Sequence, residues 1–500
     1  MPSIRSAGAR AALLLLAAAP LRGQSAAPEP SAAWKERLAR EVAAVIDAGD
    51  STAVDAFVRD RVSPRRLERG AAARLTGTLL GIARQGGGVE VRALEPWGGG
   101  VLAELWARRT DRGVRLYVSP DRGDSTRISG LETLGFIHPE AAVRLEPREG
   151  DDLAAVLRRL DAEVDRLAAA DEFSGTVLVA RGDSVVYERA AGVADRRTGE
   201  PVRPGTRFHS ASMGKMFTAV AVGQLVEAGR LRWDDSLAAV LPDLPWHPGL
   251  RGVTVAQLLG HFSGVGGWWS GAPGDDSLPP ARSRLEEVAR YASRPPLSPP
   301  GSRWSYSNEG FEVLAAIVER RGGAPFHRYL AERVFAPAGM RGVSAGVPAT
   351  DAAVGYGLAG DDPFGMGPRA GFEARVAGRA AGGSGGQFAT ARDYFRFARA
   401  LHDGALLRGA TLDSLLVAGF DQGVMPWGPQ QYARGFTTAL EGGRLLLGHA
   451  GGGMHWGICG RMDTLRDGGW TVVVLSNYDP PVCEVLARRV LASLARLPGG

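Results

Sequence analysis

The sequence predicts an α+β protein in which one antiparallel sheet is assembled from both ends of a long second domain. Two short β-like runs flank a turn near residue 182, and three more β-like runs lie between residues 444 and 477. Helical periodicity dominates the stretch between them, so the helices would form a region inserted into the sheet. The first 150 residues mix helices and short strands differently, which predicts a small α+β domain ahead of the main one.

Residues 1–24 are typical of a secretory signal peptide. Arg5 and Arg10 flank the apolar run 11–19, and small residues suitable for cleavage follow at 20–27. We therefore expect a secreted or periplasmic protein with no membrane span in the mature chain, because the apolar run is short for a bilayer. The alternative is that this run stays in place as a membrane anchor.

The composition argues against several kinds of binding partner. Basic residues are spread among similar numbers of Asp and Glu, and the net charge is only +5, so we expect no nucleic-acid partner. The eight histidines are scattered and no HExxH motif occurs, so we expect neither a metal nor a cofactor. The only cysteines are Cys459 and Cys483, and their spacing leaves open whether they pair.

Residues 31–148 are predicted to form the small α+β accessory domain. Trp34–Ala48 and Thr52–Val62 have helical periodicity. The β-like runs, separated by turns rich in Gly and Asp, are Val89–Leu94, Val101–Ala107, Val114–Val118 and Ser125–Ile128. We find no candidate chemistry in this domain, and its partner stays open.

Residues 151–497 are predicted to form the main domain. Its first helix spans Asp151–Ala170, and a hairpin pairs Thr176–Ala180 with Ser184–Arg189. Further helices are predicted at Leu237–Leu241, Val255–His261, Ser283–Ala292, Glu309–Arg321 and Val482–Leu494. The later strands are predicted at Arg444–Gly453, Trp456–Leu465 and Trp470–Asn477. The loop 263–280 carries Trp268 and Trp269, which would either shape a pocket or pack beneath the loop.

The first candidate site is a Ser-x-x-Lys sequence formed by Ser212 and Lys215, just before the apolar helical run Met216–Leu225. Residues three apart share one face of a helix, so the hydroxyl and the amine would lie side by side. A desolvated lysine loses its proton and can then accept one from a serine. The helix N-terminus would favour an oxyanion beside Ser212.

The distribution of lysine supports this interpretation. The chain has 59 Lys plus Arg, yet only Lys35 and Lys215 are lysines. Arginine stays protonated and cannot act as a base. The chain therefore keeps a lysine where the proposed chemistry needs deprotonation, although a chance Ser-x-x-Lys with a solvated lysine is the alternative.

Two later segments carry further candidate residues. In the loop before the helix at 309–321, Tyr306 can exchange a proton if a nearby amine lowers its pKa, and Asn308 can orient the lysine and bind a substrate amide. The alternative is that Asn308 caps the helix while Tyr306 packs. In the segment 449–453, His449 could bind a carboxylate or move a proton, or simply pack. Gly451 and Gly452 would let a substrate backbone approach closely.

In this order the three segments resemble the serine β-lactamase and penicillin-binding-protein family, which is marked by Ser-x-x-Lys, Ser-Asp-Asn and Lys-Thr-Gly. The Tyr-x-Asn form at 306–308 is similar to the class C branch, which includes D-alanyl-D-alanine carboxypeptidases, D-aminopeptidases and esterases. The resemblance covers about residues 151–497. It extends to the accessory stretches Val253–Gly264, Pro299–Phe311 and Val472–Asn477.

The resemblance implies a β-lactamase/transpeptidase-like fold, with an antiparallel sheet flanked by helices and an all-helical region. It implies that Ser212 forms an acyl-enzyme and that Lys215 and Tyr306 share the general-base and general-acid work. Asn308 would support the substrate and the lysine, and the N–H groups of Ser212 and Gly452 would form the oxyanion hole.

One position departs from the family pattern. His449 stands where the family has lysine, and Ala450 replaces the threonine. A neutral histidine is a weaker anion site, which favours an esterase or peptidase over an efficient β-lactamase. The leading hypothesis is thus a secreted serine hydrolase acting on an ester, amide or peptide. The alternatives are a D-alanyl-D-alanine carboxypeptidase, a D-aminopeptidase or a β-lactamase, and, in another class, a catalytically silent binding protein.

Overall fold

The computed structural model describes residues 31–497 apart from 68–70, 98–99, 111, 122–123, 138–142, 267–280, 345–350, 359–371, 376–380, 418, 426–427 and 454–455. The predicted signal segment lies outside the described residues, as do Trp268 and Trp269, which were expected either to shape a pocket or to pack beneath their loop.

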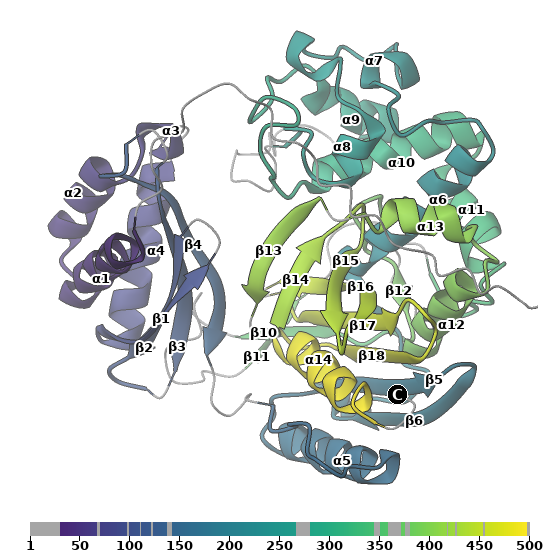
Figure 1. Ribbon diagram of the computed structural model, residues 1–500, viewed down its shortest axis with the longest axis horizontal. Helices are drawn as coiled ribbons and strands as arrows, with labels where there is room; N and C mark the ends of the chain where they lie inside the picture. The colour runs from purple at the N-terminus through teal and green to yellow at the C-terminus, as the bar shows by residue number, and fades with distance from the viewer. Residues whose placement is uncertain are drawn as a thin grey trace, which may run out of the picture.

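The N-terminal unit is a layer of helices on a four-stranded antiparallel meander (Figure 1). Its elements are α1 (Ala32–Ala48), α2 (Ser51–Arg61), α3 (Pro64–Leu67), α4 (Ala71–Gly86), β1 (Val89–Trp97), β2 (Gly100–Ala107), β3 (Gly113–Pro120) and β4 (Ile128–Ile137). The sequence analysis placed no helix over α4. The fourth strand was predicted too early, at Ser125–Ile128. In the structure the Asp124 carboxylate accepts hydrogen bonds from the Thr126 N–H and hydroxyl, which hold that stretch in a turn, and β4 begins only at Ile128.

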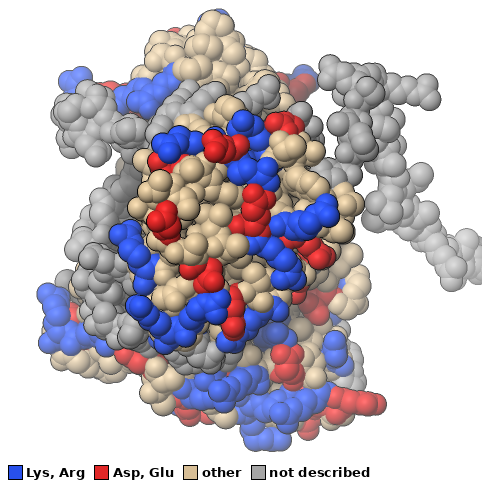
Figure 2. Space-filling view, turned by 90° about the vertical axis from the view of Figure 1, so that its left-hand side faces the viewer, with Lys and Arg blue, Asp and Glu red and all other residues tan. Residues whose placement is uncertain are grey.

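This unit has a hydrophobic cluster of its own, made only of residues between Leu38 and Leu131. Its surface carries ion pairs such as Arg61–Glu41, at 2.6 Å, and Arg108–Asp47, at 2.8 Å. Figure 2 looks onto this side of the molecule and shows basic and acidic side chains intermingled. Basic side chains on this side therefore lie among carboxylates, as the even spread of charges along the sequence indicates.

The described part of the main domain is built on an eight-stranded antiparallel sheet with the order β13-β14-β15-β16-β17-β18-β5-β6. The strands are β5 (Gly175–Arg181), β6 (Ser184–Ala191), β13 (Phe420–Met425), β14 (Gly428–Tyr432), β15 (Thr437–Glu441), β16 (Arg444–Gly453), β17 (Ile458–Leu465) and β18 (Trp470–Ser476). Strand β18 pairs with β5, which confirms that both ends of the domain form one sheet. Strands β13, β14 and β15 were not predicted from the sequence.

Both faces of this sheet are buried at its central strands β17 and β18. Successive side chains of a strand point to opposite faces, so Val472 and Val474 join one hydrophobic cluster while Val473 and Leu475 join another. The first cluster lies beneath α5 (Leu153–Ala169) and α14 (Val482–Leu494), and the second faces the other helices. A strand buried on both faces explains the continuous apolar run of β18.

The second cluster contains the inserted helical region (Figure 1). Its helices are α6 (Lys215–Glu227), α7 (Leu237–Val240), α8 (Val255–Leu259), α9 (Arg284–Ala292), α10 (Asn308–Gly322), α11 (Phe326–Leu330), α12 (Ala391–His402) and α13 (Gly409–Leu415). Short strands complete the domain: β7 (Val193–Asp195), β8 (Glu200–Pro201), β9 (Phe208–His209), β10 (Gly355–Leu358), β11 (Phe372–Arg375) and β12 (Phe388–Ala389). No helix within the described ranges combines the length and apolar character that a membrane crossing needs.

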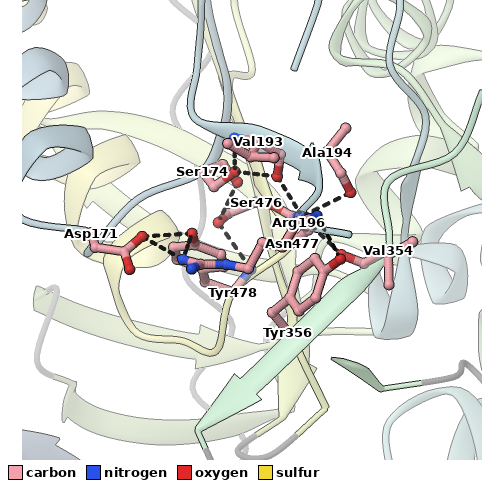
Figure 3. Close-up of polar contacts among 10 residues, drawn as sticks. All are labelled: Asp171, Ser174, Val193, Ala194, Arg196, Val354, Tyr356, Ser476, Asn477 and Tyr478. Atoms are coloured by element: carbon pink, nitrogen blue, oxygen red, sulfur yellow. Dashed lines mark hydrogen bonds and ion pairs between the residues drawn. The ribbon is translucent and has the colours of Figure 1, made fainter. Parts of the chain in front are cut away.

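Asn477, at the end of β18, ties three distant segments together (Figure 3). Its side-chain amide donates to the carbonyl oxygens of Val193 at 3.1 Å, Ala194 at 3.4 Å and Val354 at 2.8 Å. The segment around Val354 in turn pairs with Arg207, whose carbonyl accepts the Ala353 N–H at 2.8 Å. These hydrogen bonds therefore fix the chain at Arg207, directly before β9 (Phe208–His209), which leads to Ser212.

Both cysteines are buried free thiols in the structure. The Cys483 N–H donates to the Cys459 sulfur at 3.2 Å, and the Cys459 thiol lies 3.3 Å from a carboxylate oxygen of Glu484. The open question of pairing is thus answered, for this structure, by two thiols packed between β17 and α14.

A buried ion cluster lies beneath α14. The Arg461 and Asp463 side chains are both 0% exposed and pair at 2.8 Å, and Arg488 meets the same carboxylate at 2.9 Å. Burial raises the pKa of Asp463, but the two arginines more than offset this and hold it below its usual value. One carboxylate thus pairs with two buried guanidinium groups.

We predict that Asp463→Asn lowers the free energy of unfolding by about 3 kcal/mol, because it removes the carboxylate that pairs with two buried arginines. Urea unfolding followed by circular dichroism measures this. The control is Asp234→Asn, in an exposed pair with Arg232 at 3.0 Å, which should leave stability unchanged. Equal effects of both substitutions would contradict the prediction.

Candidate active site

Ser212 lies in a single 3-10 turn, Ala211–Gly214, that continues into α6. Ala211 has a φ of +41°, which is rare for a residue with a side chain and marks a strained turn just before the serine. Lys215 is the first residue of α6, and its Nζ lies 3.1 Å from the Ser212 hydroxyl oxygen. The predicted side-by-side placement of the two groups is therefore what the structure shows.

The Lys215 side chain is completely buried, and its amine has three oxygen partners. These are the Ser212 hydroxyl, the Asn308 side-chain oxygen at 2.7 Å and the Ser384 carbonyl at 2.9 Å. Burial lowers the pKa of Lys215 to about 7, although the charges of Glu312 and Glu309 act in the opposite direction. A substantial fraction of this amine is therefore unprotonated at neutral pH.

Asn308 is free to bind the lysine because another residue caps the helix. The Ser307 hydroxyl accepts the Gly310 N–H at 2.8 Å, which makes Ser307 the N-cap and Asn308 the first residue of α10. The alternative in which Asn308 caps the helix does not hold.

Tyr306 stands beside the lysine, with its ring centre 4.7 Å from the amine nitrogen. Burial raises the pKa of its phenol above the usual value of 10, and a hydrogen bond with Ser212 lowers it only in part. The condition under which Tyr306 would exchange a proton, a pKa lowered by a nearby amine, is therefore not met in the resting site. At neutral pH Tyr306 is a proton donor, and Lys215 is the group poised to accept a proton.

An aromatic wall surrounds Tyr306. His261 lies 4.3 Å from its ring, centre to centre, and the imidazole Nδ1 accepts the Ser307 N–H at 3.1 Å. Burial lowers the pKa of His261 well below its usual value, so this ring is a neutral acceptor that fixes the segment. Farther out, Trp304 stacks on Phe420 at 4.5 Å, which extends the wall to the surface.

The segment 449–453 runs along the end of β16, beside the serine turn. A Cβ atom on Gly451 would lie 2.3 Å from the Ser210 carbonyl oxygen, so only glycine permits this approach. The next residue, Gly452, pairs with Cys459 of β17 and has a φ of +149°. The structure thus brings the glycines predicted to contact a substrate next to the nucleophile.

His449 is buried rather than open to solvent. Its Nε2 lies 3.4 Å from the Tyr432 hydroxyl, and burial together with the nearby Lys215 charge lowers its pKa to about 3. The imidazole is therefore neutral at physiological pH. It presents no fixed positive charge to a substrate carboxylate.

Sequence reasoning missed four residues of this site. Ser384 contributes only its backbone carbonyl, Glu312 is an unremarked helix residue, and His261 and Tyr432 line the aromatic wall. The one local sign of this arrangement in the sequence was the glycine-rich run 382–386, because such runs are typical of places where another part of the chain approaches the backbone closely. Within the described ranges, no group of His, Cys, Asp or Glu is arranged to hold a metal ion.

We compared the sequence and the structure with those of known proteins. The sequence profile named Beta-lactamase matches residues 154–496. The chain belongs to the β-lactamase family. It is 37% identical over 205 residues to Esterase EstB of Burkholderia gladioli, covering 38% of this chain and 52% of that protein. It is 30% identical over 185 residues to Penicillin-binding protein 4* of Bacillus subtilis, covering 37% of this chain and 40% of that protein.

The family fold is also found among solved structures. A penicillin-binding protein from Bacillus halodurans superimposes with a TM-score of 0.55 at 26% identity, over 66% of this chain and 98% of that one. The chain spans about half the length of EstB and less of the Bacillus subtilis protein. The matched range leaves the N-terminal unit outside the family.

We predict that the amine of Lys215 titrates with a midpoint of about 7, because burial disfavours its charged form. Only two lysines occur, so protein labelled with ¹³C at lysine Cε gives two signals, and Lys35→Arg assigns them. A midpoint near the usual value of about 10.4 would show that the amine is solvated and charged.

Proposed function

We propose that this protein is a serine hydrolase that forms an acyl-enzyme on Ser212 and hydrolyses an ester or amide. The observation that carries the proposal is the 3.1 Å contact between the Ser212 hydroxyl and a buried lysine amine whose pKa is lowered to about 7. A neutral amine at that distance can take the serine proton as the oxygen attacks a carbonyl carbon.

The neighbouring groups supply the remaining steps. The N–H groups of Ser212 and Gly452 would stabilise the oxyanion of the tetrahedral intermediate, beside the close approach at Gly451. Tyr306, whose phenol stays protonated, would donate a proton to the leaving group. The proton would be replaced from Lys215, 4.7 Å from the Tyr306 ring centre, and water would then release the acyl group.

Two features favour a neutral ester over a substrate that carries a carboxylate. The neutral His449 gives no ionic partner for an anion, and the stacked pair Trp304–Phe420 beside Tyr306 offers an apolar surface. Phe420 is 37% exposed, so this surface is open to an acyl or alcohol group. The similarity to an esterase is consistent with this choice.

The second candidate is a D-alanyl-D-alanine carboxypeptidase, D-aminopeptidase or β-lactamase. The similarity to a penicillin-binding protein favours it, as does the family membership. A silent binding protein with the same fold would have no use for a buried lysine within reach of the serine. Burying an amine costs free energy, and catalysis gives a reason to keep it because burial alters its basicity.

We predict that Ser212→Ala abolishes hydrolysis of p-nitrophenyl butyrate, with a fall in kcat of at least about 10³-fold, because it removes the hydroxyl that lies 3.1 Å from the Lys215 amine. Wild type and variant are compared by stopped-flow absorbance with nitrocefin in parallel. Mass spectrometry of the quenched wild type should show an adduct on Ser212. Undiminished turnover in the variant would overturn the mechanism.

We predict that His449→Lys raises kcat/KM for nitrocefin, which carries a carboxylate, about tenfold relative to p-nitrophenyl butyrate. The added cation would supply the anion partner that the neutral imidazole lacks. Leu440→Lys is the matched control, since it adds the same charge at a β15 residue that is 72% exposed. If both variants gave the wild-type ratio, charge at position 449 would not govern substrate choice.

A further inference from the structure

The loop Gly382–Gly386 passes close to Lys215, and at Gly383 and Gly385 it leaves no room for a side chain. A Cβ atom on Gly383 would lie 2.0 Å from the Phe311 carbonyl oxygen, and one on Gly385 would lie 1.7 Å from the Ala211 carbonyl oxygen. Gly385 also has a φ of +131°, which side chains disfavour. The loop is thus wedged between α10 and the serine turn, and it places the Ser384 carbonyl 2.9 Å from the Lys215 amine.

One carboxylate holds this loop from behind. Glu312 accepts the N–H of Gly383 at 3.1 Å, the N–H of Ser384 at 3.0 Å and the Ser384 hydroxyl at 2.7 Å. It lies one turn after Asn308 on α10, so a single helix face presents both a direct partner of Lys215 and the anchor of another partner.

Arg284 of α9 fixes the carboxylate in turn. Its guanidinium pairs with Glu312 and also lies 3.5 Å from Glu319, two turns farther along α10. Burial would raise the pKa of Glu312, but the Arg284 charge and the donors of the loop bring it below its usual value. Glu312 is therefore a buried anion, and its charge opposes the effect of burial on Lys215.

We propose that Glu312, held by Arg284, is a positioning residue that places the Ser384 carbonyl on the Lys215 amine and sets how firmly that amine keeps its proton. This inference rests on the proposed role of Lys215 as the base. It assigns to Glu312 no contact with substrate. It explains why a carboxylate is buried one helical turn from a site whose reaction needs a neutral amine.

The titratable groups around the lysine leave few other sources for this effect. Tyr306 and Glu309 approach from the start of α10, His261 from the end of α8 and His449 from β16. Both histidines are neutral because burial lowers their pKa values, and burial keeps the phenol protonated. Among the described residues, the negative charges that act on Lys215 are therefore those of Glu312 and Glu309, and of these Glu312 holds the loop.

The test is Glu312→Gln, which keeps the size of the side chain and removes its charge. Loss of the anion, with Arg284 left uncompensated, should shift the Lys215 titration in the lysine-labelled protein downward by at least about half a pH unit. The kcat for p-nitrophenyl butyrate should fall about tenfold or more while KM changes less than about twofold. The acidic midpoint of the pH profile should move with the lysine.

Glu319→Gln is the matched control, because it removes another carboxylate partner of Arg284 that does not touch the loop. Its Lys215 titration and its kcat should equal those of the wild type. Ser384→Ala, which removes only the 2.7 Å hydroxyl contact, should lower kcat about two- to fivefold at constant KM, and it keeps the proposal testable if Glu312→Gln does not fold. An unmoved lysine midpoint in folded Glu312→Gln, an equal shift in Glu319→Gln, or an unchanged kcat in Ser384→Ala would overturn the proposal.

The lysine titration also separates this inference from the proposed function. It reports on Lys215 without substrate, so a shift in Glu312→Gln supports the electrostatic role even if the wild type hydrolyses no ester. Turnover lost in Ser212→Ala with no lysine shift in Glu312→Gln would leave the hydrolase and remove only the role of Glu312.

Discussion

The site depends on the removal of one ammonium group from water. Lys215 is completely buried, and its nitrogen has three oxygen partners, none of which is a carboxylate. Neutral oxygens stabilise a buried cation less than a paired anion would, so burial lowers the pKa of the amine toward neutrality. The strained turn at Ala211, the capping by Ser307 and the glycine loop all serve to hold those oxygens around a single nitrogen atom.

The titratable groups around Lys215 have pKa values far from neutrality, unlike the lysine itself. Burial keeps the Tyr306 phenol protonated and leaves His261 and His449 neutral, although all three lie close to the lysine. A site with several groups titrating together near pH 7 would lose the active combination with small changes of pH. Here the described groups that contact Lys215 leave the amine alone with a pKa near neutrality, and the carboxylates act on it from α10.

Local sequence patterns predicted the residues whose chemistry resides in their side chains. Ser212 and Lys215 were found because three-residue spacing on a helix is a local property, and Tyr306 and Asn308 were found by residue type and order. Ser384 was missed because it acts through a backbone carbonyl, which every residue has. The direction of the Tyr306 pKa shift could not be read from the local sequence, since its surroundings include His261 and Tyr432, which are distant in sequence. Likewise, β13 to β15 were missed because their pattern is short and mixed, whereas β18 is a continuous apolar run.

The pairing of β18 with β5 also bears on the order in which the protein is made. Leu178 and Val473 are partners in adjacent strands although almost the whole main domain separates them in sequence. The sheet therefore closes only after the chain has been synthesised through β18. A nascent chain that already contains Ser212 and Lys215 therefore lacks the strand beside them until β16 has been synthesised.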